Sequence, residues 1–211
     1  MAKNDFAYEV DFPPYDECLA EGGFDSHYSM ENAHWCLLGE IVSFEPFMRF
    51  RTIIRDKNGE KLVVAFYLDR DDNINPANFK VGHTLAIMNP QQRFFLDGTK
   101  GVRVEESHRV AVFPTSLKSL FGIGKSIVSD CGDRDDGKKM CHGCKKLGDT
   151  KDMMRCGACH YYYYCSKECQ AKGWNELGHK QACKVVERAN FKALVELDFD
   201  NHQGDFKFAV E

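Results

Sequence analysis

Long apolar runs are missing from this sequence of 211 residues. None approaches the roughly 18 residues that a membrane-spanning helix needs, so the sequence predicts no spanning segment. The first ten residues, MAKNDFAYEV, also lack the apolar core of a signal peptide, and we expect an intracellular protein of the nucleus or cytoplasm. A large excess of one charge is lacking too. The net charge is −4, which argues against a chain that wraps nucleic acid over its whole surface.

Signatures of catalysis are scarce as well. The segment FGIGKS at 121–126 ends like a phosphate-binding loop, but Ser119 stands where the first glycine of G-x-x-x-x-G-K-[ST] belongs, and no βαβ context follows. We interpret this segment as part of a linker. No cofactor motif is present, and no Cys-His-Asp set stands at a recognisable catalytic spacing. We therefore expect no enzymatic activity.

Cysteine, in contrast, is abundant. Seven of the ten cysteines fall between Cys141 and Cys183. In a reducing compartment, clustered cysteines indicate metal ligands rather than disulfides. The charge balance changes nearby, because residues 1–130 hold 14 Lys and Arg against 19 Asp and Glu, whereas residues 131–211 hold 14 against 13. We expect two parts joined by a Gly- and Asp-rich linker over 121–140.

The first part begins with an acidic segment and continues with strand-like runs. Residues 1–31 carry eight acidic residues and one basic residue, which predicts an extended acidic arm. A domain over 32–120 follows, with a bulge or bend expected at Gly39 and a hairpin turn at Asn58-Gly59. A short helix or turn is expected over 76–80. The predicted strands cover residues 34–44, 47–56, 61–69, 83–89, 92–96, 101–106 and 109–114.

This order of elements resembles the OB-fold, a five-stranded Greek-key barrel. The sequence thus predicts an α+β protein, in which a small OB-like antiparallel β-barrel precedes a zinc module and a C-terminal helix. OB barrels often bind single-stranded nucleic acid across strands 2 and 3. Here the second strand presents Arg49, Arg51 and Arg55, with Phe47 and Tyr67 nearby. The alternative is an ordinary polar face whose arginines pair with neighbouring acids, which the negative charge of this part favours.

The second part carries a specific metal-binding pattern, C-x2-C-x11-C-x2-C-x5-C-x3-C-x9-H-x3-C. Eight donors suffice for two tetrahedral zinc sites, one with four thiolates and one with three thiolates and an imidazole. No donor is left for an open coordination position, so we predict that both zinc ions are structural. The donors are Cys141, Cys144, Cys156, Cys159, Cys165, Cys169, His179 and Cys183.

The spacing also indicates which donors share a metal ion. Pairing in sequence order would join the first two C-x2-C pairs over a gap of 11 residues, shorter than the 15–20 that ribbon-like sites usually have. Crossed pairing gives gaps of 20 and 19 residues and joins a C-x2-C knuckle to a helical i,i+4 pair in each site. We therefore predict one site with Cys141, Cys144, Cys165 and Cys169, and another with Cys156, Cys159, His179 and Cys183.

Residues 141–183 resemble the MYND zinc-finger family. The resemblance rests on the eight donors, on Tyr164 before Cys165, on CSKECQ, and on Trp174 ahead of HKQAC. One departure is the insertion Asn175–Gly178, where the family spacing is commonly shorter. The resemblance implies the same crossed arrangement of zinc ligands.

The family resemblance also implies a function. It predicts a protein-interaction module that binds short proline-containing peptides in a shallow groove, with Gln170 and Trp174 as groove residues. For Trp174 a second interpretation stays open, namely a lid that only packs over the zinc sites. His142 and His160, which adjoin ligands, are expected to be spectators. Some family relatives carry this finger within a methyltransferase domain, but no matching cofactor motif is present here.

The leading hypothesis is a non-enzymatic adaptor with a peptide-binding zinc finger and a barrel for a second partner. The alternative is a regulatory protein that binds single-stranded nucleic acid through the barrel. Because about 45 residues cannot bury enough surface to fold alone, zinc is expected to fold residues 141–183. Residues 184–211 are expected to form one helix over Lys184–Leu197, which could pack on the barrel, and a polar tail with two exposed phenylalanines.

Overall fold

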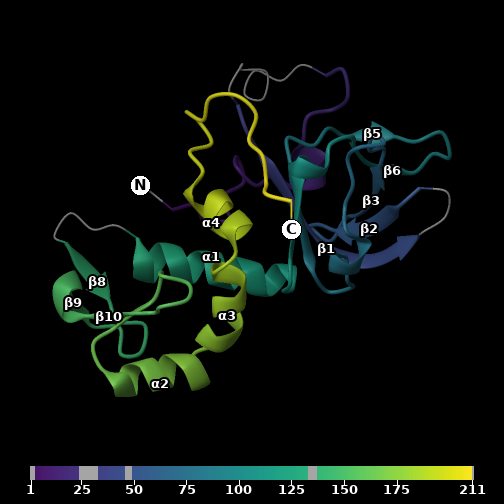
Figure 1. Ribbon diagram of the computed structural model, residues 1–211. Coiled ribbons are helices and arrows are strands. Elements are labelled where there is room, and N and C mark those ends of the chain that lie inside the picture. Colours follow the sequence, from purple (N-terminus) through teal and green to yellow (C-terminus); the bar gives the residue numbers. More distant parts are fainter. Residues whose placement is uncertain (1–2, 24–32, 46–48, 133–136, 211) are drawn as a thin grey trace. The chain divides into compact units, whose positions relative to one another are not determined.

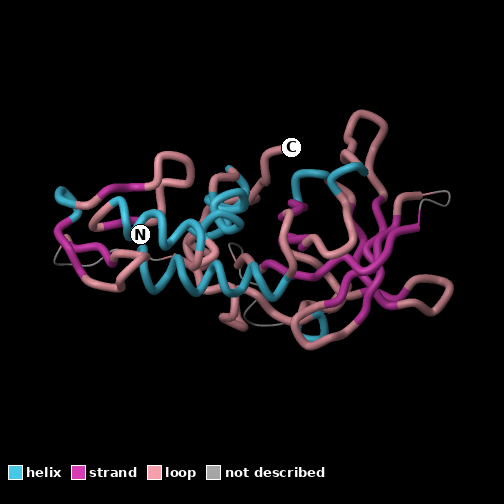
Figure 2. Tube along the Cα trace, turned by 90° about the horizontal axis from the view of Figure 1, so that it is seen from below, coloured by secondary structure: helices cyan, strands magenta, loops and turns pink. Residues whose placement is uncertain are grey.

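The computed structural model describes residues 3–23, 33–45, 49–132 and 137–210. It has a mixed α+β fold that divides into two compact units. The sheet unit comprises Ala7–Leu120 and Asp198–Glu211, and the finger unit comprises Met1–Phe6 and Phe121–Leu197. Most strands belong to the sheet unit, whereas the finger unit is mainly helical (Figure 2). No helix among the described residues is long and apolar enough to cross a bilayer.

The sheet unit is built on one seven-stranded sheet with the strand order β5-β6-β3-β2-β1-β4-β7 (Figure 1). Three 3-10 helices, η1 (Tyr15–Glu17), η2 (Pro76–Asn78) and η3 (Ser107–Arg109), lie between or before the strands. The strands are β1 (Cys36–Glu45), β2 (Arg51–Arg55), β3 (Lys61–Phe66), β4 (Thr84–Met88), β5 (Arg93–Phe94), β6 (Lys100–Val104) and β7 (Val110–Phe113).

Alternation along the chain decides which face of the sheet is buried. In β2, Thr52 and Ile54 are fully buried while Arg55 is exposed, as the alternating pattern predicts. Phe47 and Met48 of the same predicted strand lie outside the described residues. The register shift in β1 falls between Ile41 and Ser43 rather than at Gly39. The core of the unit contains Trp35, Leu37, Ile41, Ile54, Leu62, Val64, Phe66, Leu85, Ile87 and Val102.

The predicted antiparallel barrel needs correction. Among the described residues, β5 and β7 end the sheet without pairing with each other, and β3 pairs with β6 in parallel. The chain passes directly from β6, beside β3, to β7, beside β4. Between them, the Asp72 carboxylate accepts hydrogen bonds from the backbone N–H and the hydroxyl of Ser107. These bonds hold η3, which lies between β6 and β7 in the chain.

Both terminal segments of the sheet unit are packed rather than extended. Phe12 and Tyr15 of the predicted acidic arm are buried, and the Tyr15 hydroxyl donates to the Gly101 carbonyl over 3.1 Å. Residues 24–31 of that arm lie outside the described residues. In the tail, Phe208 is buried and Phe206 half-buried, so the expectation of two exposed rings was wrong. Apolar rings cover each other in both segments.

The finger unit begins within helix α1 (Leu117–Cys131), which crosses the boundary between the two units. Most of the predicted irregular linker over 121–140 is therefore a helix, and FGIGKS lies inside it. Its Leu120, Ile127 and Cys131 are buried, which shows an apolar helical face that the glycines and acids obscured. Two small sheets of two strands each follow: β8 (Lys138–Met140) pairs with β9 (Leu147–Asp149), and β10 (Met154–Arg155) pairs with β11 (Tyr163–Tyr164). The 3-10 helix η4 (Thr150–Asp152) lies between β9 and β10 in the chain.

Three short helices complete the finger unit: α2 (Lys167–Asn175), α3 (His179–Val186) and α4 (Ala189–Glu196). The single helix expected over Lys184–Leu197 is thus broken, because Arg188 has an extended backbone. This break turns the apolar residues of α4 toward the N-terminal segment. Asn4 donates from its backbone to Val195 O over 2.8 Å, and Phe6 meets Phe191 edge-on at 5.6 Å.

Candidate metal centre

The structure gathers the eight metal-binding side chains of the finger into two tetrads. In each tetrad, the four donor atoms lie within 4.8 Å of one another. The two tetrads contain the same residues as the two sites predicted by crossed pairing. His142 and His160 belong to neither, and neither do the other three cysteines among the described residues. The tetrads are Cys141, Cys144, Cys165 and Cys169 (site 1) and Cys156, Cys159, His179 and Cys183 (site 2).

The donor distances fit tetrahedral zinc. In site 1, the Sγ atom of Cys165 lies 3.6 Å from that of Cys144 and 3.5 Å from that of Cys169. In site 2, Cys156 and Cys183 are separated by 3.8 Å between sulfurs. A tetrahedron with Zn–S bonds of about 2.3 Å has S–S edges of roughly 3.8 Å, whereas a disulfide bond is only about 2.05 Å long. Both sets therefore suit one structural zinc ion each.

The two C-x2-C knuckles share one backbone geometry. The residue after each second cysteine, Lys145 or His160, has a left-handed backbone with φ of 62° or 63°. Its N–H donates back to the carbonyl of the first cysteine, over 2.8 Å to Cys141 and 3.1 Å to Cys156. This tight turn holds the two thiols of a knuckle on one side of the chain.

Helices supply the other donors. Ser166 caps α2 by accepting a hydrogen bond from the Cys169 N–H over 3.2 Å, which fixes that cysteine in the first turn. His179 begins α3, and Cys183 lies one turn further on. Asn175 ends α2, residues 176–178 form the turn between α2 and α3, and Gly178, with φ of 77°, precedes the first residue of α3. The insertion therefore leaves the His179–Cys183 pair on one helical turn.

Gly143 lets the two halves of site 1 approach each other. A Cβ atom at this position would lie 2.5 Å from the Cys169 carbonyl oxygen and 2.7 Å from the Cys169 Cβ. The corresponding residue of the second knuckle is Ala158, so an alanine is compatible with the knuckle itself. Glycine is required here because α2 crosses so close to the knuckle.

Electrostatics favour the metal-binding form of one donor in each site. Burial lowers the pKa of His179 to about 4, so its imidazole is neutral at pH 7 and can ligate a metal. The Tyr164 hydroxyl is hydrogen-bonded to Nδ1 of this ring, while Nε2 lies 3.5 Å from the Cys159 sulfur. Burial opposes ionisation of the Cys141 thiol, but hydrogen bonds at its sulfur, first among them that from the Cys144 backbone, lower its pKa to about 6. A zinc ion would supply only structural bonds, because each site already has four protein donors.

The two predicted groove residues lie on α2, one helical turn apart. Gln170 is exposed, and 39% of Trp174 is exposed. The Trp174 ring also meets the His179 ring edge-on at 5.2 Å. The Trp174 side chain thus packs against a predicted zinc ligand and also presents a face to solvent. Of the four consecutive tyrosines, all but Tyr163 are buried.

Sequence reasoning missed Asp130, which lies at the end of α1. Its carboxylate is 4% exposed and accepts hydrogen bonds from His142 and from the Lys145 ammonium. Burial would raise the pKa of Asp130, but these bonds outweigh it and hold the pKa below its usual value. No sequence signal marked Asp130, because a lone acid in an apparent linker has no motif. His142 is thus a structural anchor rather than a mere spectator.

The basic strip of the sheet unit is largely compensated by acids. Arg51 pairs with Asp97 at 3.5 Å, and Arg55 pairs with Glu40 at 3.8 Å. Arg49 instead lies over the Tyr67 ring, 4.4 Å from its centroid. Arg51 and Arg55 thus behave as the alternative interpretation, an ordinary polar face, predicts. Arg49 does not, because it lies over an aromatic ring.

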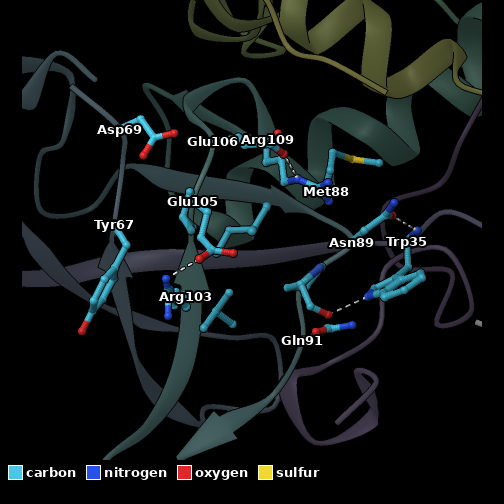
Figure 3. A pocket seen from close by; sticks show the side chains of 14 residues that line it. Trp35, Tyr67, Asp69, Met88, Asn89, Gln91, Arg103, Glu105, Glu106 and Arg109 are labelled. Carbon is cyan, nitrogen blue, oxygen red and sulfur yellow. Dashed lines mark hydrogen bonds and ion pairs between the residues drawn. The ribbon is translucent and has the colours of Figure 1, made fainter. Parts of the chain in front are cut away.

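The sheet unit also contains a cavity of about 660 Å³ (Figure 3). Four of its charged side chains form ion pairs, since Arg103 contacts Glu105 and Arg109 contacts Glu106, and Asp69 also lines it. The Trp35 indole N–H donates to the Pro90 carbonyl over 3.0 Å. This mixture of charges of both signs does not indicate a particular class of ligand.

Comparison with known proteins places the finger in a family. Residues 130–183 match the family model of the MYND finger. A SET and MYND domain-containing protein of Dictyostelium discoideum is 41% identical over 51 residues, and the histone-lysine N-methyltransferase SMYD1 of Homo sapiens is 37% identical over 49 residues. Programmed cell death protein 2 of Bos taurus is 48% identical over 46 residues. These matches cover 22–23% of this chain and only 9–13% of the relatives.

Two solved structures from fission yeast share a distant similarity. The Stn1–Ten1 complex gives a TM-score of 0.31 at 14% identity, over 44% of this chain and 77% of the other. The structure of Pot1pC bound to ssDNA gives a TM-score of 0.32 at 7% identity, over 49% of this chain and 96% of the other. Scores this low support no conclusion about ligands. The family match and the two tetrads together identify residues 130–183 as a MYND finger with two structural zinc sites.

Proposed function

We propose that this protein is a non-enzymatic adaptor whose MYND finger binds a short proline-containing peptide through α2. The observation that carries the proposal is the position of Trp174. Its ring is partly exposed, lies one turn from the exposed Gln170, and is braced by the His179 ring of site 2. A rigid, partly exposed indole provides a large contact area at little entropic cost, which is typical of residues that anchor interfaces.

A set of labelled peptides tests this function. Each proline-containing peptide is paired with a version in which alanine replaces proline, and both are titrated with the zinc-loaded chain. We expect binding of some proline peptides, loss of binding to their alanine versions, and loss with Trp174→Ala. Leu147→Ala is the matched control, because Leu147 is also an exposed apolar side chain of the finger but lies on β9. Equal binding by wild type and Trp174→Ala would refute the groove.

A catalytic role is not part of this proposal. Each zinc site has four protein donors, which leaves no coordination position for a substrate or an activated water. Because the relatives with SET domains match this chain only over the finger, their activity provides no argument for this protein.

We also propose that the sheet unit is an OB-like barrel interrupted at η3. The support is topological: β1, β2 and β3 form a meander, β4 returns beside β1, and the consecutive strands β6 and β7 lie beside β3 and β4. Joining β6 and β7 into one bent strand would complete a five-stranded Greek key. Such a barrel would serve a second partner.

One observation favours single-stranded nucleic acid as that partner. Arg49 and Arg103 both lie over the Tyr67 ring, at 4.4 and 4.5 Å from its centroid. Cations beside an aromatic ring suit a base and its phosphate. We expect salt-dependent binding of a labelled oligothymidylate that is weakened by the double variant Arg49→Glu, Arg51→Glu. No binding at low salt would remove this candidate.

A further inference from the structure

The finger unit contains a second, strongly basic cavity of about 430 Å³, which we call the basic pocket. Four basic side chains line it from four parts of the unit: Lys3 from the N-terminal segment, Lys139 from β8, Arg155 from β10 and Lys192 from α4. Among the described residues that line the pocket, Glu196, also on α4, is the only one with a carboxylate. The charges of the lining therefore sum to about +3, in a unit whose sequence is otherwise nearly neutral.

The single carboxylate is already used within the pocket. Glu196 accepts a hydrogen bond from the Tyr161 hydroxyl and pairs with Lys3 at 3.3 Å. Lys3 also lies over the Tyr161 ring, 4.6 Å from its centroid. This contact set orders one side of the pocket and pairs one of its cations, which leaves a positive surplus in the lining.

Two of these basic side chains, Arg155 and Lys192, have N–H groups that could donate hydrogen bonds to a ligand. Arg155 donates from Nε to the His160 carbonyl over 2.7 Å, which fixes its guanidinium beside the Tyr163 ring. Its two terminal nitrogens have no hydrogen-bond or ion-pair partner among the described residues, and neither does the Lys192 ammonium. Lys139 donates to the backbone carbonyls of Cys131 and Gly132, over 3.3 Å in each case. An anion would meet donors that are held in position before it binds.

We propose that the basic pocket binds an anionic side chain of a partner peptide, either a carboxylate or a phosphate. A peptide fits better than a nucleic acid, because the cations converge on one cavity instead of following a track. The Tyr161 ring offers little surface for stacking a base either, since this residue is only 5% exposed. Convergent Arg and Lys donors are the usual means of reading acidic and phosphorylated residues in peptides.

This second surface is separate from the proposed groove. None of the residues that line the basic pocket belongs to α2, which carries Gln170 and Trp174. The inference shares with the proposed function only the premise that the finger unit binds peptides. One partner could therefore contact both surfaces, or two partners could bind at once.

Fluorescence anisotropy with the full, zinc-loaded chain tests the proposal. The probes are a labelled Gly-Ser peptide with four consecutive glutamates, the same peptide with one phosphoserine in place of the glutamates, and a neutral version with glutamines. We expect salt-sensitive binding of one or both anionic peptides and none of the neutral one. The two anionic arms tell a carboxylate from a phosphate. Lys192→Glu should lower the affinity about tenfold or more, through loss of one charge-assisted contact and added repulsion.

The matched control is Lys125→Glu, which makes the same charge change at an exposed position of α1 outside the pocket. It should change the affinity less than about twofold. Lys192 is half-buried on α4 and is not a zinc ligand, and zinc content of two per chain verifies that the variant is folded. Equal losses with Lys192→Glu and Lys125→Glu would overturn the pocket, and so would absence of binding by both anionic peptides.

Two further arms separate this inference from the proposed function. Trp174→Ala should bind the anionic peptides like wild type, and if it loses them the anion binds in the groove and the basic pocket is refuted. A labelled oligothymidylate should not compete with the anionic peptide, and effective competition that Lys192→Glu abolishes would identify a nucleic-acid site instead. Failure of proline peptides to bind would refute the groove while leaving the basic pocket intact.

Discussion

The Nδ1 atom of His142 donates a hydrogen bond of 3.0 Å to Oδ2 of Asp130, and thereby ties the end of α1 to the first zinc knuckle. Both side chains are buried, with 7% and 4% of their surfaces exposed. The Lys145 ammonium, from the same knuckle, is a second donor to this carboxylate and carries a charge. The family match begins at Asp130, so the matched segment includes this anchor. Helix α1 is thus joined to site 1 through side chains rather than through a metal ligand.

We predict that Asp130→Ala destabilises the finger unit by about 3 kcal/mol, because it leaves a buried imidazole donor without its charged partner. Unfolding by denaturant, followed through Trp174 emission in a Trp35→Phe background, measures this change. Asp149→Ala serves as the control, since Asp149 is an exposed carboxylate on β9 and its loss should cost less than about 0.5 kcal/mol. Equal stability of the two variants would contradict a structural role for the Asp130–His142 pair.

The metal centre could be predicted from the sequence because coordination chemistry constrains it locally. Eight soft donors at knuckle and helix spacings admit few arrangements, and the gap lengths distinguish crossed from sequential pairing. Asp130 could not be found in the same way. No sequence spacing predicts a buried carboxylate. His142 comes within hydrogen-bonding distance of Asp130 only when the knuckle is folded.

Strands were predicted better than their connections. The alternation in 51–55 and the turn at Asn58-Gly59 are local features, so they carry over to β2 and β3. The parallel β3–β6 pair joins segments that are distant in the sequence, and η3 is held by a bond between Asp72 and Ser107 across 35 residues, so neither has a local signal. Helix α1 was missed because its glycines and terminal acids suggested a linker, although its buried positions follow a helical period.

Zinc removal should unfold the finger and spare the sheet. The two tryptophans report separately, since Trp35 belongs to the core of the sheet unit and Trp174 to α2. With Trp35→Phe, a strong chelator should shift the Trp174 emission to the red, because each structural zinc site supplies on the order of 10 kcal/mol of folding free energy. With Trp174→Phe, the Trp35 emission should stay constant. A circular dichroism spectrum that does not change after complete removal of zinc would contradict the metal-dependent fold.

Gly143→Ala should weaken site 1 although alanine is the smallest possible addition. The new methyl group would overlap the Cys169 carbonyl, and displacing α2 to relieve this contact costs about 1–3 kcal/mol. Competition with a zinc chelator should show one of the two zinc ions released about tenfold more readily. Gly157→Ala is the matched change in the other knuckle, where a Cβ atom meets nothing within 4 Å. If both variants retain two zinc ions with wild-type affinity, the close approach of knuckle and helix is not as described.

The sheet unit should lose stability in mild acid because of His34. This side chain is 6% exposed, its Nδ1 is hydrogen-bonded to Asn89 Nδ2 over 3.1 Å, and its ring lies 5.2 Å from that of His202. Burial, with repulsion from His202, lowers the pKa of His34 below its ordinary value of 6.5. Between the folded-state pKa and the unfolded-state pKa of 6.5, the unfolded chain binds more protons than the folded chain. The contribution of neutral His34 to the free energy of unfolding is therefore complete above pH 6.5 and declines as the pH falls toward the folded-state pKa.

Denaturant unfolding of the Trp174→Phe variant between pH 7.5 and 5.5 measures this decline in stability. Trp35, whose emission is followed, belongs to the core of the sheet unit and is the residue next to His34. Adding His34→Gln should flatten the pH dependence, since glutamine has no proton to gain. Adding His160→Gln removes an exposed histidine of the finger unit and should leave the slope unchanged. A slope that persists in full with His34→Gln would assign the acid sensitivity to another group, because linkage requires the titrating side chain itself to be present.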